Sequence, residues 1–332
     1  MPPFGSSAAR YSSAVAGYEI SEASMRDIQR VTISVLIGSW LLLPAGALTG
    51  NTGSVEQGCV PAPAGLVGWW PGDGHTSDLS ASGLDGVVVG SGVTYAPGLV
   101  GPAFQFNNEN GRVLVPYSPD LDSALALTIE AWVQPWSPPL ENVGLVVDHA
   151  GAFGTTTVGG GYALTMQTFV NGTAAAGVHL SNVPGSLNWD SLYSPAVPVN
   201  AWYHLVGAYD AAALRYRFYV NGVDIYGTGR DPGAPNPINY YQQLDLSIGN
   251  ALGVIGGIDR GFYGLIDEVR VFNRALSAAE IGSIFDAGSA GVCKVTTVCH
   301  KPSTGAGKTL KIPTQALSGH LGHGDTMGAC LN

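Results

Sequence analysis

Short apolar or alternating stretches, separated by turn-forming residues, make up most of the chain between residues 66 and 272. In segment 128–134, Ile129, Ala131 and Val133 alternate with Thr128, Glu130 and Trp132, as in a strand with two unlike faces. Short strands at this spacing are typical of a sandwich and not of βαβ units. The predicted strands are 66–70, 86–89, 103–106, 112–115, 128–134, 145–148, 162–167, 202–209, 244–248 and 262–272.

Two local patterns predict connections near the end of this region. Asn221 and Gly222 lie between two β-rich runs within 215–226, and both residue types tolerate the positive φ angles of a type I′ turn. Ser277 and Glu280 have the spacing of a capping box, and Gly288 is placed to end the helix that follows. We therefore predict a β-hairpin and one short C-terminal helix.

The N-terminal region has the pattern of an export segment. Residues 31–43 form an apolar run that follows Arg26 and Arg30 and precedes small residues ending at Ala47. Such a run is shorter than the roughly 20 residues of a membrane span. We predict a signal peptide with an extended N-region over 1–47, and hence a secreted or cell-surface protein. The alternative is an uncleaved anchor, which would be the chain's one contact with a membrane.

Composition and charge narrow the class of protein further. The chain holds 47 glycines and 21 prolines, and only 11% of its residues are charged, which favours β structure. From Leu48 to Cys293 seven arginines stand against twenty acids, whereas all four lysines follow Cys293. An acidic domain repels nucleic acid and leaves carboxylates available for cations. We therefore predict no nucleic-acid partner.

Four cysteines lie beyond the predicted cleavage site, as expected of disulfides in an exported chain. Three pairings are open to four cysteines. We favour Cys59 with Cys293, which would join the two ends of the main domain, and Cys299 with Cys330, which would close a small tail. The predicted organisation is a linker over 48–64, a main domain over 65–291 and a Cys- and His-containing tail over 292–332.

Several motifs, taken in order, carry a family resemblance. Segment 264–277 (GLIDEVRVFNRALS) resembles the final strand and helix of laminin-G-like, concanavalin A-like jelly rolls, and segments 68–71, 78–86, 128–133, 202–205 and 218–222 also match. The resemblance covers roughly 65–288 and implies an all-β, two-sheet antiparallel jelly-roll sandwich. Its members include carbohydrate-binding, adhesive and structural modules, so the fold alone does not decide the function.

The resemblance also implies a structural calcium ion where an acidic loop meets the last strand. Asp78 and Asp267 match those positions, and Asp73 and Asp85 are further contributors. Calcium takes 6 to 8 oxygen ligands, which carboxylates and loop carbonyls can supply.

The residues themselves leave an alternative to calcium open. Asp267 alternates with Leu265, Val269 and Val271, so we expect it on a buried face, where a carboxylate needs a partner. An arginine could be that partner, and Asp78 could instead form an Asx-turn within its own loop.

Loop aromatics are the candidates for sugar binding, because a sugar ring stacks on an aromatic face while polar groups bind its hydroxyls. Packing against the sandwich is the alternative explanation for each of them. The candidates are Trp136, Trp189, Tyr193, Tyr240 and Tyr241.

Catalysis has little support in the sequence. Polysaccharide-cleaving enzymes need two carboxylates flanking the scissile bond. Glu130 faces away from Ile129 and Val133, and Asp267 and Glu268 are expected on opposite faces of one strand. We predict no enzymatic activity.

The tail resembles a terminal segment that recurs in exported bacterial proteins. Zinc is bound by residue types that the tail contains, namely His300, His320, His323, Asp325 and the tail thiols. The alternative is a disulfide with surface histidines.

From all these features we predict a secreted, non-catalytic recognition or adhesion module whose partner is a glycan or an extracellular protein. The other hypotheses are a structural or interaction module without sugar binding and a polysaccharide-active enzyme.

Overall fold

The computed structural model describes residues 58–107, 110–137, 142–150, 160–181, 190–227, 237–240, 243–252, 260–301, 307–313, 316–327 and 330. The predicted signal peptide and most of the predicted linker lie outside these residues. Among the helices described, none has both the length and the apolar character to cross a membrane.

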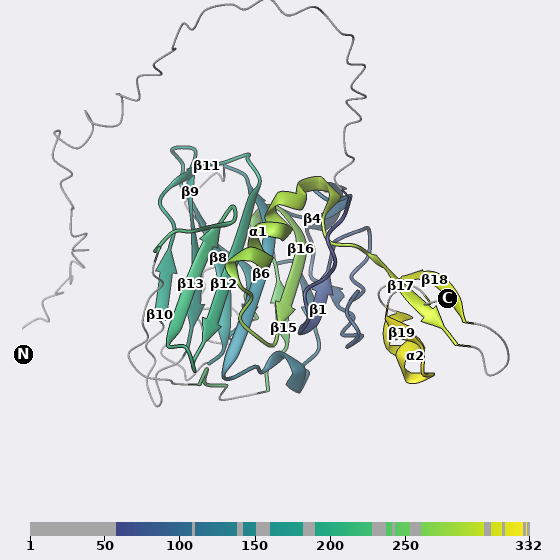
Figure 1. The fold of residues 1–332 in the computed structure, drawn as a ribbon. Helices are drawn as coiled ribbons and strands as arrows, with labels where there is room; N and C mark the ends of the chain where they lie inside the picture. The colour runs from purple at the N-terminus through teal and green to yellow at the C-terminus, as the bar shows by residue number, and fades with distance from the viewer. Residues whose placement is uncertain are drawn as a thin grey trace, which may run out of the picture. The chain divides into compact units, whose positions relative to one another are not determined.

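Two antiparallel sheets, each of eight strands within the described residues, form the main domain (Figure 1). The strands of the first sheet are β1 (Leu66–Trp70), β3 (Val93–Pro97), β4 (Pro102–Asn107), β6 (Ala126–Pro135), β12 (Tyr203–Asp210), β13 (Arg215–Val220), β14 (Val223–Asp224) and β16 (Tyr263–Phe272). The strands of the second sheet are β2 (Val87–Val89), β5 (Arg112–Val115), β7 (Asn142–His149), β8 (Tyr162–Thr168), β9 (Thr173–Leu180), β10 (Asp190–Tyr193), β11 (Val197–Pro198) and β15 (Leu246–Ile248).

Strand order places β16 and β6 in the middle of the first sheet. That sheet runs β14-β13-β12-β6-β16-β4-β3, with β1 also paired to β16. The second sheet runs β10-β9-β8-β7-β15-β5-β2, with β11 paired to β9. Neighbours in the sheets are often far apart in sequence, which confirms the predicted jelly-roll sandwich.

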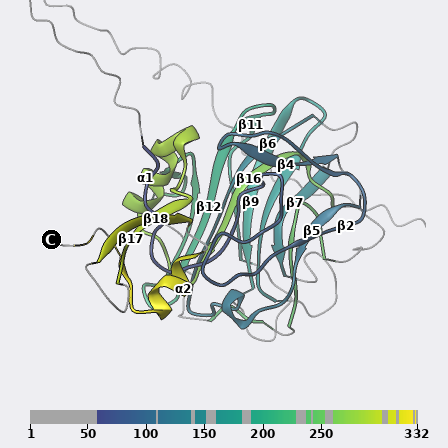
Figure 2. The ribbon, with the colours of Figure 1, turned by 90° about the vertical axis from the view of Figure 1, so that its right-hand side faces the viewer.

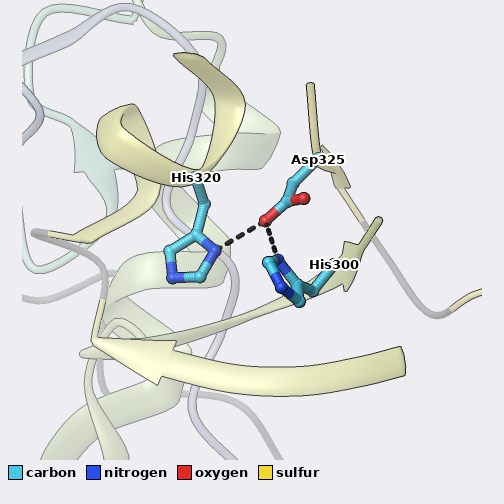
Figure 3. Close-up of side chains that lie close together, drawn as sticks. All are labelled: His300, His320 and Asp325. Atoms are coloured by element: carbon cyan, nitrogen blue, oxygen red, sulfur yellow. Dashed lines mark hydrogen bonds and ion pairs between the residues drawn. The ribbon is translucent and has the colours of Figure 1, made fainter. Parts of the chain in front are cut away.

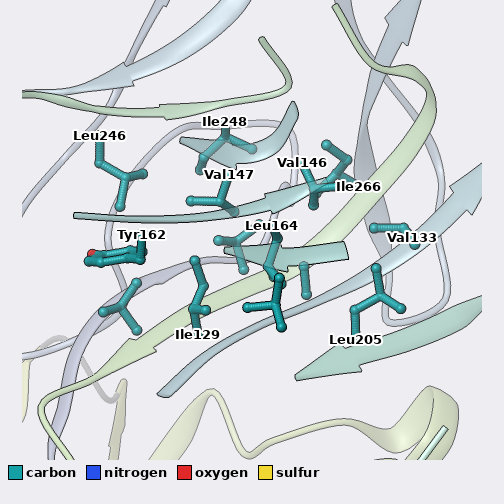
Figure 4. Packing of buried hydrophobic residues seen from close by; sticks show 14 of the residues in the cluster. Ile129, Val133, Val146, Val147, Tyr162, Leu164, Leu205, Leu246, Ile248 and Ile266 are labelled. Carbon is teal, nitrogen blue, oxygen red and sulfur yellow. The ribbon is translucent and has the colours of Figure 1, made fainter. Parts of the chain in front are cut away.

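The core lies between the facing sides of the two sheets. Figure 4 shows Ile129, Val133 and Ile266 of the first sheet packed near Val147 and Leu164 of the second. Ile129, Ala131 and Val133 are essentially inaccessible to solvent, as the alternation within 128–134 predicts. Burial of such apolar area is the main force that closes the sandwich.

The outer face of the first sheet is also covered. The helix α1 (Ala278–Ala287) lies against it, as Figures 1 and 2 show, and Ile281 and Ile284 pack against Trp69 and Phe272. The predicted capping box is confirmed, because the Ser277 hydroxyl accepts from the Glu280 N–H and the Glu280 carboxylate accepts from the Ser277 N–H. A 3₁₀ turn, η2 (Gly288–Ala290), follows α1 directly, and another, η1 (Pro119–Leu121), follows β5.

The turn prediction at the β13–β14 hairpin is confirmed. Asn221 has φ 51° and Gly222 has φ 75°, as a type I′ turn requires. In contrast, β9 was not predicted, because its inward positions include Ala174 and Ala176, and alanine has low β-propensity. The strands β3, β10 and β11 were also missed.

Both favoured disulfides are present. Cys59 pairs with Cys293, and Cys299 pairs with Cys330, so no described cysteine has a free thiol. Disulfides are typical of proteins from oxidising compartments.

The tail has its own small sheet, with three strands and one helix among the described residues. Its order is β18-β17-β19, and its helix is α2. The bounds are β17 (Val295–His300), β18 (Lys308–Pro313), α2 (Leu317–Gly322) and β19 (Thr326–Met327). None of these elements was predicted.

Candidate functional site

A group of buried and half-buried charged side chains lies on the outer face of the first sheet, beside the cluster that α1 covers. We call it the outer-face charge cluster, and it consists of Asp73, Glu130, Asp267, Glu268, Arg270 and Lys294. The Arg270 guanidinium donates to Glu130 Oε1 at 2.7 Å and to Glu268 Oε2. It also lies 4.8 Å above the centre of the Trp69 ring, whose N–H donates to Glu268. Arg270 is therefore the central cation of the cluster.

Glu130 is held in its ionised form by its neighbours. Its side chain is fully buried, and its second oxygen lies 3.1 Å from His204 Nε2. Burial alone would raise the pKa of Glu130, but Arg270 and His204 outweigh this and hold it below its ordinary value. The His204 ring stacks on Trp132, which in turn stacks on Phe285 of α1.

A β-bulge in β16 corrects two expectations about face assignment. Pairing with β6 shifts register between Asp267 and Arg270, and Glu268 has φ 55° within the bulge. Val269 and Val271 face the inner core, whereas Asp267 is opposite Trp132 on the outer face. The prediction that Asp267 shares a face with Val269 and Val271 is therefore wrong, as is the prediction that Asp267 and Glu268 point to opposite faces. An extra residue in one strand resets the two-residue period.

Asp267 is a buried carboxylate with only part of its hydrogen-bonding capacity used. Its Oδ2 accepts from the backbone N–H groups of Leu99 and Val100, both at 2.9 Å. Its Oδ1 is buried and makes no hydrogen bond within the described residues. Burial raises the pKa of Asp267 to about 8, and the Glu268 carboxylate adds to the rise. Asp267 therefore binds a proton far more readily than an exposed aspartate.

Asp78 is different, because protein donors surround both of its oxygens. Its Oδ1 accepts from the N–H groups of Trp69 and Ser80, and its Oδ2 accepts from the Ser80 hydroxyl and the Leu84 N–H. Asp85 accepts from the Asp78 N–H at 2.8 Å and so belongs to the same loop network. The Ser80 contact is the Asx-turn of the alternative interpretation.

Calcium shared by Asp78 and Asp267 does not fit this arrangement. The four donors on Asp78 direct hydrogens at the lone pairs that a cation would need. In addition, Lys294 Nζ lies 2.5 Å from Asp73 and 3.0 Å from Glu268, so an ammonium group already neutralises part of the outer-face charge cluster. Calcium at Asp267 itself stays a prediction.

The predicted loop aromatics fall into three environments. Trp136 is half-buried and meets Tyr263 edge to face. Tyr240 packs beside His149 and Tyr162 against the core, and burial raises its pKa well above the ordinary value. These contacts favour packing for Trp136 and Tyr240. Trp189 and Tyr241 lie outside the described residues. Tyr193 is the remaining candidate.

Tyr193 lies at the edge of the sandwich where β10 approaches β13, and a second tyrosine joins it. The Tyr226 hydroxyl accepts from the Tyr193 N–H and donates to the Tyr193 carbonyl, both at 2.9 Å. Tyr193 is 55% exposed and Tyr226 is 43% exposed. We call these two residues the tyrosine edge. Sequence analysis missed Tyr226 because it follows the hairpin and is 33 residues from Tyr193.

A groove of about 680 Å³ is lined by residues of β12 and β13 and by the start of α1. Arg215, Arg217 and Arg274 contribute to its lining, together with Asp210 and Glu280. Arg217 also pairs with Asp224, whose carboxylate accepts from the Tyr226 N–H. Arg217 therefore links the lining of the groove, through Asp224, to the backbone of Tyr226.

Comparisons with solved structures found similar structures at low sequence identity. Domain 4 of the extracellular arabinanase AbnA from Geobacillus stearothermophilus, solved with arabinotriose, is 20% identical over 65% of this chain and 96% of that one, with a TM-score of 0.42. The binding domain of Paraclostridial Mosquitocidal Protein 1 is 15% identical over 67% of this chain and 52% of that one (TM-score 0.48). Trypanosoma rangeli sialidase is 18% identical over 69% of this chain but only 34% of that one (TM-score 0.47).

A search of curated proteins found no match. The family profile described as the concanavalin A-like lectin/glucanases superfamily matches residues 107–282, which is more than half of the chain. This chain therefore belongs to the concanavalin A-like lectin/glucanases superfamily.

Proposed function

We propose that this protein is a secreted, non-catalytic recognition or adhesion module that binds a glycan at the tyrosine edge. The observation that carries the proposal is a pair of exposed rings, each held by a different contact. Two hydrogen bonds between the Tyr226 hydroxyl and the Tyr193 backbone hold the Tyr226 ring, and the Tyr193 ring packs edge to face against His179. Aromatic faces that are already held in place lose little conformational entropy when a sugar stacks on them. Arg217 and Asp224 lie close by and can bind hydroxyl groups.

The candidate carboxylates support a non-catalytic role. Glu130 and Glu268 are fully buried and both pair with Arg270, so a glycosidic oxygen has no access to them. Hydrolysis of a glycoside needs one carboxyl group on each side of the scissile bond. A polysaccharide-active enzyme is therefore the less favoured function, and these two carboxylates would not be its catalytic pair.

The experiment is a glycan array on the purified secreted protein, followed by titration of the best ligand against variants. Tyr193→Ala and Tyr226→Ala are each expected to weaken binding by roughly tenfold or more, because about 1.4 kcal/mol of stacking corresponds to a factor of ten. Tyr226→Phe keeps the ring but removes both hydrogen bonds, so we expect an intermediate loss.

The matched control is Tyr95→Ala. Tyr95 is 37% exposed and lies on β3, at the opposite end of the first sheet from β14. Its removal should leave binding unchanged. If the array shows no glycan ligand, the alternative of an interaction module without sugar binding replaces this proposal; equal losses for Tyr95→Ala and Tyr193→Ala would exclude the tyrosine edge as the site.

A further inference from the structure

Three potential metal ligands from separate parts of the tail meet at one point (Figure 3). His300 is the last residue of β17, His320 lies in α2, and Asp325 directly precedes β19. One ligand atom from each side chain lies within 4.8 Å of the others. This convergence is independent of the tyrosine edge and of the outer-face charge cluster.

One carboxylate oxygen is the centre of this group. Asp325 Oδ2 lies 2.9 Å from His300 Nδ1 and 2.6 Å from His320 Nδ1, as the dashed lines in Figure 3 show. The other oxygen, Oδ1, accepts from the Lys301 backbone N–H at 2.9 Å. The backbone therefore holds the carboxylate in an orientation that directs Oδ2 at both imidazoles.

The carboxylate of this group is buried, whereas the two imidazoles are partly exposed, so a metal ion can approach from the imidazole side. The Asp325 side chain is fully buried, whereas the His320 and His300 side chains are 27% and 39% exposed. The carboxylate thus forms the base of a shallow site, and the two imidazoles form its walls.

We propose that His300, His320 and Asp325 bind one zinc ion through the two Nδ1 atoms and Asp325 Oδ2. Two neutral imidazoles and one carboxylate are preferred zinc ligands, and three protein ligands leave the fourth tetrahedral position for water or a partner's group. Ions that prefer oxygen, such as calcium and magnesium, fit this nitrogen-rich set poorly.

The present spacing is close to what zinc requires. Ligand atoms at about 2.0–2.1 Å from a tetrahedral ion lie about 3.3 Å from one another. The two N···O distances of 2.6 and 2.9 Å therefore need to open by about 0.7 and 0.4 Å. In the metal-free chain each Nδ1 must carry a proton to donate to Oδ2. Binding of zinc at Nδ1 would require each neutral imidazole to carry its proton on Nε2, and a second ring proton, where present, would pass to water.

The disulfide changes which residues can contribute. Cys299 and Cys330 are bonded to each other, so neither supplies a thiolate, and the zinc set predicted from sequence is reduced to nitrogen and oxygen ligands. The bridge joins the end of β17, next to His300, to the C-terminal end of the tail. His323 has an exposed side chain and is not among the three converging ligands.

The test is calorimetric titration of zinc into the full secreted chain under non-reducing conditions, with His300→Gln, His320→Gln and Asp325→Asn as variants. The parent is expected to bind one zinc ion per chain. Each variant should lose more than about 100-fold in affinity, beyond the roughly 10- to 100-fold lost when only an outer partner of a ligand is removed. Calcium, titrated in the same way, should not compete.

His323→Gln is the matched control, because it removes a neighbouring imidazole and should leave zinc affinity unchanged. Non-reducing mass spectrometry checks that each variant keeps the Cys299–Cys330 bridge. If Asp325→Asn fails to fold, the result for His300→Gln decides.

Cobalt(II) binding gives a second measurement. Visible absorption bands typical of tetrahedral cobalt, without a thiolate charge-transfer band, would support the site. Absence of zinc binding by the parent, or equal binding by the parent and His320→Gln, would show that the three side chains form only a structural hydrogen-bonded group.

Discussion

Replacing Arg270 with methionine is expected to lower the free energy of unfolding by about 3–5 kcal/mol. Methionine fills much of the arginine volume but leaves the Glu130 and Glu268 carboxylates buried without the guanidinium between them. Removal of one partner from a buried ion pair is strongly destabilising, and here two carboxylates lose their guanidinium at once. Glu130 would keep only His204, and Glu268 would keep only Lys294 and the Trp69 N–H. Urea unfolding of the oxidised protein at neutral pH measures the loss.

Arg274→Met is the matched control for Arg270→Met. Arg274 also pairs with a glutamate, Glu280, but both side chains are about one-third exposed, so we expect a loss of about 1 kcal/mol or less. Adding Glu130→Gln to Arg270→Met should recover part of the lost stability, because one stranded charge is then removed. Equal losses for Arg270→Met and Arg274→Met would contradict the central role assigned to Arg270.

Replacing Asp267 with asparagine is expected to stabilise the protein increasingly as the pH rises from about 4 to 8. The pKa of Asp267 is raised from 3.8 to about 8 on folding, so within this window the folded chain binds a proton that the unfolded chain has lost. Stability of the parent therefore falls with rising pH, by up to about 1.4 kcal/mol per pH unit from this group. Asparagine carries no charge and can still accept from the Leu99 and Val100 N–H groups.

The measurement is the difference in the free energy of unfolding between Asp267→Asn and the parent at pH 5, 6, 7 and 8. The contributions of the other titrating groups are the same in both proteins and cancel in this difference. Asp78→Asn is the control of opposite sign. It should destabilise the protein, because its amide group would face donors at Trp69, Ser80 and Leu84. A pH-independent difference for Asp267→Asn would refute the protonation argument.

The same variant tests for calcium. The outer-face charge cluster holds four carboxylates against the cations Lys294 and Arg270, so either a proton on Asp267 or a bound cation would reduce its excess negative charge. If calcium binds at Asp267, added calcium should raise the melting temperature of the parent, a chelator should lower it, and Asp267→Asn should be less stable than the calcium-loaded parent. If neither calcium nor the chelator changes the melting temperature of the parent, the prediction of a calcium site is wrong.

Local sequence patterns were sufficient where one strand or turn determines the outcome by itself. The alternation through Ile129 and Val133 predicts the inner face of β6, Asn221-Gly222 predicts the hairpin turn, and Ser277 with Glu280 predicts the start of α1. In each case the physical cause acts within a few residues: side chains alternate in a strand, φ is positive in the turn, and N–H groups need caps at a helix start.

The sequence by itself determined the two-sheet class and the short helix, because these follow from periodicity and caps. It favoured one of three cysteine pairings, which the structure then confirmed. Only the tertiary structure decided which carboxylates meet. The bulge at Asp267 and Glu268 moves both to the outer face, and no two-residue pattern can reveal an inserted residue. Likewise Tyr193 meets Tyr226, and His300 meets Asp325, because strand pairing and a disulfide join segments that are distant along the chain.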